Sequence, residues 1–175
     1  MGTHNHRLQL GSSVYLEIVA LDPDGISPGR SRWFGLDDRD KIRLDWDEGR
    51  RLRGWVASTV DIDFVMASHQ GVFGERVALP FDNPTFGFSI PSDGSLPLDG
   101  AIPSLIDHRD DPTLMTDIPD LDARLLSFTL EHPEPSAIAA LFNDLGIDRP
   151  PEITLGPKTR YRAQIETATG PKDLT

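Results

Sequence analysis

The side chains best suited to chemistry gather near the N-terminus, where His4, His6 and Glu17 are close in sequence. Two imidazoles and a carboxylate around an open position suit divalent Fe, Mn, Ni or Zn. A carboxylate beside Asn5 and Tyr15 on a sheet face is also how a general base or a ligand-orienting group is placed. The segment therefore offers either a divalent metal site or a metal-free binding site with Glu17 as its catalytic residue.

A β-hairpin must position these side chains. Residues 6–20, HRLQLGSSVYLEIVA, are two runs rich in Leu, Val, Ile and Tyr on either side of a Gly-Ser-Ser turn at residues 11–13. If the turn spans all three residues, Leu10 pairs with Val14. We prefer this register because it separates apolar from polar side chains cleanly, and the buried face sets the register of a strand pair.

The register gives the hairpin two faces. One is apolar and consists of Leu8, Leu10, Val14, Leu16, Ile18 and Ala20. The other carries the predicted ligand-binding residues Asn5, Arg7, Tyr15 and Glu17, with Arg7 opposite Glu17 as a favourable cross-strand pair. His4 and His6 then point away from Glu17, so we expect them to be partly buried at the sheet end and not to share a metal with it.

The composition excludes several classes of function. The 175 residues include no Cys, so thiolate catalysis, disulfides and zinc-thiolate sites are impossible. The net charge of −11 is the wrong sign for binding a phosphate backbone, so we expect no nucleic-acid partner. No apolar run is long enough for a membrane span and no signal peptide is visible, which favours a cytoplasmic protein without a membrane partner. Neither a GxSxG nor a GxGxxG motif occurs.

The order of elements after the hairpin predicts an α+β fold. Residues 1–50 hold the hairpin and a long polar surface connection, with one helical turn near residues 37–41 and Trp33 and Phe34 as a loop anchor. Residues 51–107 read as strand, helix and three strands, a complete βαβββ module. Residues 108–121 form an acidic linker.

The C-terminal segment, residues 122–175, repeats part of this order. It reads as a strand, the strongest predicted helix of the chain, and two strands, which is a βαββ partial module. Pro133 and Pro135 stand at the entrance of the helix, and Gly146 ends it. His69, His108 and His132 are isolated along the chain, and we expect them to be structural.

Five short stretches resemble the glyoxalase-like proteins of the vicinal oxygen chelate superfamily. They are GTHN at 2–5, VYLEIVA at 14–20, RWFGLDD at 32–38, IPSLID at 102–107 and EHPEP at 131–135. The resemblance implies βαβββ modules whose curled mixed sheets surround a cavity, with few short helices outside. It also implies a strand and a helix ahead of GTHN, which the N-terminal module of this chain lacks.

Only part of the superfamily's metal site has matching residues in this sequence. Members of the superfamily place a His on the first strand and a Glu on the last strand of each module, and Glu17 matches one of these positions. Gly54 and Ser104 stand at about the other two positions that can be counted in the complete module. The sequence therefore predicts no metal site, and a divalent metal stays an alternative. Ser58 and Ser104, on the first and last strands of that module, complete the predicted ligand-binding set.

Three functions follow as hypotheses. The leading one is a glyoxalase-like protein that binds a small polar or amphiphilic metabolite in a sheet-lined cavity, with enzymatic activity left open. The alternative is a metal-dependent lyase, isomerase or ring-cleaving dioxygenase of the same superfamily. The third is a non-catalytic assembly protein, in which the half-module hairpin is covered by the C-terminal segment or by a second chain in a homodimer.

Overall fold

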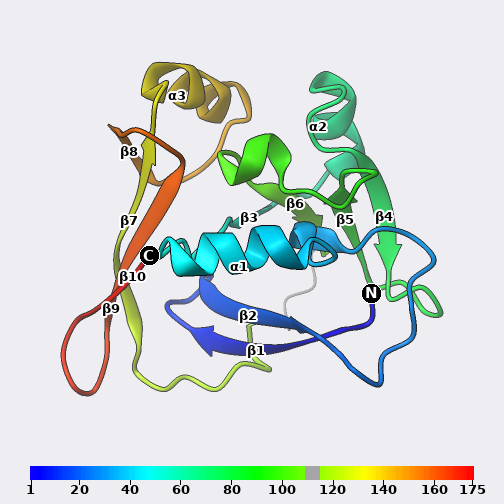
Figure 1. The fold of residues 1–175 in the computed structure, drawn as a ribbon, viewed down its shortest axis with the longest axis horizontal. Coiled ribbons are helices and arrows are strands. Elements are labelled where there is room, and N and C mark those ends of the chain that lie inside the picture. The colour runs from blue at the N-terminus through cyan, green and yellow to red at the C-terminus, as the bar shows by residue number, and fades with distance from the viewer. Residues whose placement is uncertain (109–114) are drawn as a thin grey trace.

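The computed structural model describes residues 1–108 and 115–175, so residues 109–114 of the predicted acidic linker lie outside the described residues. The described chain is an α+β protein, as predicted, with three α-helices and three open sheets (Figure 1). Two of the sheets are mixed, since each contains one parallel strand pair. None of the helices in the described ranges is long and apolar enough to cross a membrane.

The N-terminal hairpin has the predicted register. Strand β1 (Thr3–Gln9) pairs antiparallel with β2 (Tyr15–Leu21), and Arg7 lies opposite Glu17. The N–H of Leu10 donates to the carbonyl of Val14 at 2.8 Å, which closes the three-residue turn. The Gly-Ser-Ser turn and the alternation of apolar and polar side chains were therefore sufficient to predict the pairing.

The first complete unit has the predicted βαβββ order. It consists of β3 (Val56–Ser58), α2 (Ile62–Ser68), β4 (Glu75–Leu79), β5 (Phe86–Ile90) and β6 (Ser104–Asp107). The strand order is β3-β6-β5-β4, with β3 and β6 parallel at one edge. Trp33 and Phe34 stack at 5.3 Å and both pack edge-on against Phe88 of β5, so they anchor the preceding loop as predicted.

The C-terminal unit has one strand more than the sequence indicated. It consists of β7 (Arg124–His132), α3 (Pro135–Asp144), β8 (Glu152–Leu155), β9 (Arg160–Glu166) and β10 (Lys172–Leu174). Pro135 occupies the first turn of α3, where its missing N–H costs no hydrogen bond. The strand order β10-β9-β7-β8 places the first strand of this unit inside its sheet, whereas β3 lies at the edge of its own.

The connection over residues 22–50 contains more helix than predicted. Beyond the short turn η1 (Trp33–Gly35), a nine-residue helix α1 (Arg39–Asp47) forms, capped by the Asp38 carboxylate, which accepts from the Lys41 N–H at 2.9 Å. The prediction of one turn near residues 37–41 was too short. The buried residue of α1 is Asp45, a carboxylate, so an apolar stripe could not reveal the helix.

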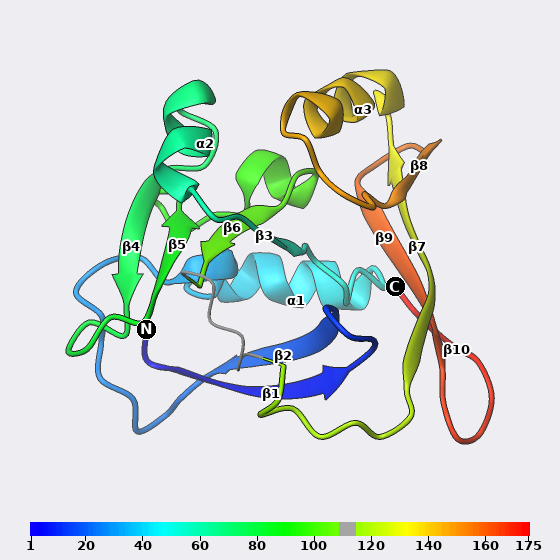
Figure 2. The same cartoon turned by 180° about the vertical axis from the view of Figure 1, so that it is seen from behind.

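One hydrophobic core joins the two units. Its buried members come from α2 and the loop after it, from β6 and the loop before it, and from β7, α3 and β9. They are Ile62, Phe73, Ala101, Ile102, Leu105, Leu130, Ile138, Phe142 and Tyr161. The hydroxyl of Tyr161 donates to the carbonyl of Gly100 at 2.7 Å, at the end of η2 (Pro97–Gly100). In both views α2 and α3 lie at one end of the molecule and the hairpin at the other, with α1 crossing between them (Figures 1 and 2).

Candidate functional site

The polar face of the hairpin brings together four of the predicted site residues. Arg7 and Glu17 are cross-strand partners, and the amide of Asn5 donates a hydrogen bond to the carboxylate of Glu17. Tyr15 lies two residues before Glu17 on the same face of β2. Asn5 and Arg7 are exposed, whereas Tyr15 and Glu17 are half-buried. The four side chains therefore form a continuous polar surface with a carboxylate partly removed from water.

Burial has the largest effect on the pKa of the Glu17 carboxyl group. It raises the pKa of Glu17 above its usual value, against the hydrogen bond from Asn5 and the charge of Arg7, which both act to lower it. The pKa of Tyr15 is also raised, first by burial and then by the negative charge of Glu17, while Arg7 opposes the shift. A carboxylate with a raised pKa is a better proton acceptor, which is the property a general base requires.

We expect Glu17→Gln to change stability in a pH-dependent way. A carboxyl group whose pKa is raised in the folded state stabilises the fold below its unfolded pKa, and this contribution is lost as pH rises through the folded value. Glutamine resembles the protonated acid and does not titrate. Urea unfolding at mildly acidic and at neutral pH should therefore show the variant gaining stability relative to wild type as pH rises. A difference in stability between variant and wild type that is the same at all pH values would contradict the raised pKa of Glu17.

His4 and His6 are more exposed than we expected from the sequence. The register places both on the face opposite Glu17, as predicted, but both are exposed and not partly buried. The reason is that the C-terminal unit covers only the turn end of the hairpin, where Leu8 and Leu16 pack against a core that includes Ala163. At the other end, Ile18 is 63% exposed.

The donors present do not fit a metal centre. Among residues 1–108 and 115–175, no group of three or more His, Asp or Glu side chains is placed to hold an ion. At Gly54, where the resemblance would require a ligating His, a Cβ atom would lie 3.0 Å from a methyl carbon of Leu96. A His side chain at this position would therefore have to displace Leu96. The βαβββ unit of residues 51–107 does not place a ligand at the position where the superfamily has its His.

Ser58 and Ser104 lie on a different sheet from the other four residues. Ser104 pairs with Val56 and Ser58 with Ile106 across the parallel β3-β6 pair, so both serines lie on one face of that sheet. Ser104 is buried and Ser58 is exposed. The structure thus brings the two serines together on one sheet, and it brings Asn5, Arg7, Tyr15 and Glu17 together on another.

Two clefts in the described structure were not suggested by the sequence. One, of about 310 Å³, lies between α2 and the end of α3 and is lined by Phe64, Val65, Ser68, His69, Asp144 and Leu145. The other, of about 540 Å³, runs along the loops beside Gly74, Pro91 and Leu98. Neither is lined by a predicted site residue. The first combines residues 75 positions apart, so no local motif could have indicated it.

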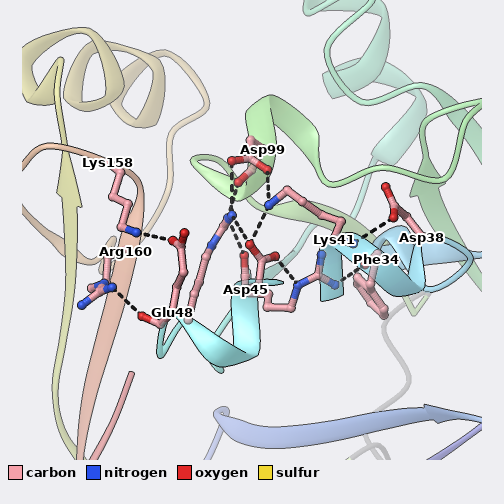
Figure 3. A network of polar contacts seen from close by, with 10 residues as sticks. Phe34, Asp38, Lys41, Asp45, Glu48, Asp99, Lys158 and Arg160 are labelled. Carbon is pink, nitrogen blue, oxygen red and sulfur yellow. Dashed lines mark hydrogen bonds and ion pairs between the residues drawn. The ribbon is translucent and has the colours of Figure 1, made fainter. Parts of the chain in front are cut away.

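A network of ion pairs joins α1 to the loops beside it (Figure 3). Asp45 is 5% exposed and accepts hydrogen bonds from Lys41 Nζ at 2.6 Å and from Arg53 Nε at 2.9 Å. The guanidinium of Arg50 lies 3.6 Å from the same carboxylate and 3.2 Å from Asp99. Burial opposes the charge of Asp45, but the hydrogen bonds from Lys41 and Arg53 and the charge of Arg50 prevail and hold its pKa below the usual value.

The same network extends to the C-terminal unit. Glu48, which follows α1, forms an ion pair with Lys158, and its carbonyl accepts a hydrogen bond from Arg160 at 2.9 Å. On the other side, Arg53 donates to the carbonyl of Phe34 at 2.7 Å. These contacts fasten α1 to both neighbouring parts of the chain, so we assign the network a structural role.

The fold, with its βαβββ unit and a polar sheet face, is that of a glyoxalase-type protein. The model of the glyoxalase-like domain family matches residues 1–146, most of the chain. The chain therefore belongs to the glyoxalase-like domain family of the vicinal oxygen chelate superfamily, and the predicted family is confirmed. No curated protein and no solved structure matches it significantly.

Proposed function

We propose that this glyoxalase-like protein binds a small polar or amphiphilic metabolite in a sheet-lined cavity, with the polar face of the hairpin as the wall that contacts the ligand. The observation that carries the proposal is the position of Glu17, a half-buried carboxylate that is held by Asn5 and lies across from Arg7. Burying a carboxylate is unfavourable unless its interactions compensate, and here burial outweighs them, since the pKa is raised. A carboxylate whose pKa is raised by unfavourable burial is typical of functional sites.

The chemistry of the four side chains indicates the kind of ligand. Arg7 offers a guanidinium that suits a carboxylate or another anionic group. Glu17 accepts hydrogen bonds from hydroxyl or amino groups, and Tyr15 adds a phenol and an aromatic surface. A hydroxycarboxylic or amino acid would satisfy Arg7 and Glu17 at once. If the ligand is transformed, Glu17 is the residue of this set that would take the proton.

Ser58 and Ser104 belong to the proposal as additional hydroxyl groups on the β3-β6 sheet. Among the described residues, neither serine forms a hydrogen bond with Asn5, Arg7, Tyr15 or Glu17. The proposal therefore depends on the four hairpin residues. The metal-dependent lyase, isomerase or dioxygenase is the less favoured alternative, because the donors of the described chain do not form a ligand set. A homodimer and a cytoplasmic location remain proposals, the first of them supported by the exposed Ile18 on the hairpin.

The proposal predicts that Arg7→Ala and Glu17→Ala each weaken ligand binding. A hydrogen bond to a charged group contributes about 1.5–3 kcal/mol, so the dissociation constant should rise roughly tenfold or more. The measurement is calorimetric titration with a panel of small hydroxycarboxylates, amino acids and sugars. His6→Ala is the matched control, since His6 is exposed on the opposite face of the same strand. Unchanged binding in both Arg7→Ala and Glu17→Ala would show that the proposed site is wrong.

A further inference from the structure

Both ring nitrogens of His69, the residue that follows α2, lie within hydrogen-bond distance of an oxygen atom. Its Nδ1 lies 3.0 Å from the carbonyl oxygen of Val65, one turn back in α2. Its Nε2 lies 2.9 Å from Oδ2 of Asp144, at the end of α3. The contact with Asp144 is therefore a direct polar link between the helix of the first unit and the helix of the C-terminal unit, which lie at the same end of the molecule (Figures 1 and 2).

The partners of His69 favour the protonated ring. A carbonyl oxygen and a carboxylate oxygen are both acceptors, so each ring nitrogen must donate a proton. Neutral imidazole carries one N–H and can make only one of these two bonds, whereas imidazolium makes both. His132 is a contrast within the same chain, because its Nδ1 accepts a hydrogen bond from the N–H of Glu134 at 3.0 Å.

The surroundings of His69 allow it to exchange protons with solvent. It borders the cleft of about 310 Å³ between α2 and α3, and although its own side chain is 14% exposed, that of Asp144 is 73% exposed. Asp144 is the charged group that faces it in the described chain. Asp63, the acidic residue within α2, is 3.6 Å from Arg76 instead. Phe73 contributes only a ring edge.

We propose that His69 is a pH-sensitive latch between α2 and α3. With both nitrogens protonated it holds the Val65 carbonyl and the Asp144 carboxylate together. Loss of one proton removes the positive charge that faces Asp144 and leaves one N–H for two acceptors, so the pairing with Asp144 weakens and α3 is held less tightly to α2. The latch lies outside the hairpin face proposed to bind ligand, so a test of one proposal does not decide the other.

The direction of the pH dependence follows from the contacts. The hydrogen bond to Val65 raises the pKa of His69, burial opposes the rise, and the hydrogen bond and charge of Asp144 add to it. A histidine whose pKa is raised in the folded state stabilises the fold below its unfolded pKa of about 6.5. This stabilisation is lost as pH rises through the folded value, so the latch is closed at mildly acidic pH and open at alkaline pH.

NMR titration of the histidine rings tests the latch on the intact chain. We expect His69 to titrate above the ordinary histidine value of about 6.5, and to move back toward that value in Asp144→Asn. Asp148→Asn is the matched control, because it removes an exposed carboxylate of the same region that pairs with Arg149. A wild-type His69 that titrates at or below about 6.5 would overturn the proposal without the need for any variant.

A double-mutant cycle with His69→Gln and Asp144→Asn measures the link itself. The two side chains should be coupled by roughly threefold in the unfolding equilibrium constant at about pH 5.5, as expected for a partly exposed ion pair. The coupling should fall to near unity at about pH 9. Equal coupling at both pH values would mean a permanent structural contact, and the latch would be rejected.

Discussion

Replacing Asp45 with alanine is expected to lower the free energy of unfolding by about 3–5 kcal/mol. The carboxylate is 5% exposed and is bonded or closely paired to Lys41, Arg50 and Arg53. Without it, Lys41 and Arg53 lose their shared acceptor. The buried Arg50 keeps Asp99 as its paired carboxylate. Removing one partner from a buried ion-pair network is strongly destabilising. Urea unfolding monitored by circular dichroism measures the change.

The control for this substitution is Asp47→Ala on the same helix. Asp47 is exposed and pairs at 3.5 Å with the exposed Arg43, so its loss should cost less than about 1 kcal/mol. The pKa of Asp45 is lowered in the folded state, so its contribution is present at neutral pH and is lost as pH falls through the folded value. The deficit of Asp45→Ala should therefore shrink in acid. Similar effects of the two substitutions at neutral pH would contradict the role of the network.

Leu130→Ala is expected to destabilise the protein by about 2–5 kcal/mol, since it leaves a cavity in the core that joins the two units. Leu130 of β7 is 0% exposed and belongs to the same cluster as Ile62 of α2 and Phe142 of α3. Leu126→Ala on the same strand is the matched control, because Leu126 is 50% exposed.

Thermal and urea unfolding of the two leucine variants distinguish a shared core from two separate ones. A single cooperative transition with a lower midpoint is expected for Leu130→Ala, and a change of less than about 1 kcal/mol for Leu126→Ala. A Leu130→Ala protein that unfolds in two steps, or one that is no less stable than Leu126→Ala, would show that the two units do not depend on this core.

Elements determined by local sequence were predictable. The hairpin register followed from the alternation of side chains around the turn at residues 11–13, and it placed Arg7 opposite Glu17. Helix α3 was predicted from its proline entrance and apolar stripe. The same local information brought four of the six predicted site residues onto one face.

Elements determined by tertiary contacts were not predictable. Helix α1 buries Asp45, whose partners Arg50 and Arg53 lie beyond the helix, so its buried side chain is a charged one that the sequence pattern does not mark as buried. The pairing of His69 with Asp144 spans 75 positions and has no motif. The exposure of His4 and His6 depended on how far along the hairpin the C-terminal unit extends, and a strand pattern specifies the face of a residue but not what covers it.

The position of the binding site on the hairpin is tested most directly by backbone-amide NMR during titration with the panel of hydroxycarboxylates, amino acids and sugars. For any compound that binds, the chemical-shift changes should concentrate in residues 3–21, and in Glu17→Ala they should require roughly tenfold more ligand or more. Changes concentrated in the cleft between α2 and α3, or around Gly74 and Pro91, would contradict the proposed site, as would a panel that produces no change at all.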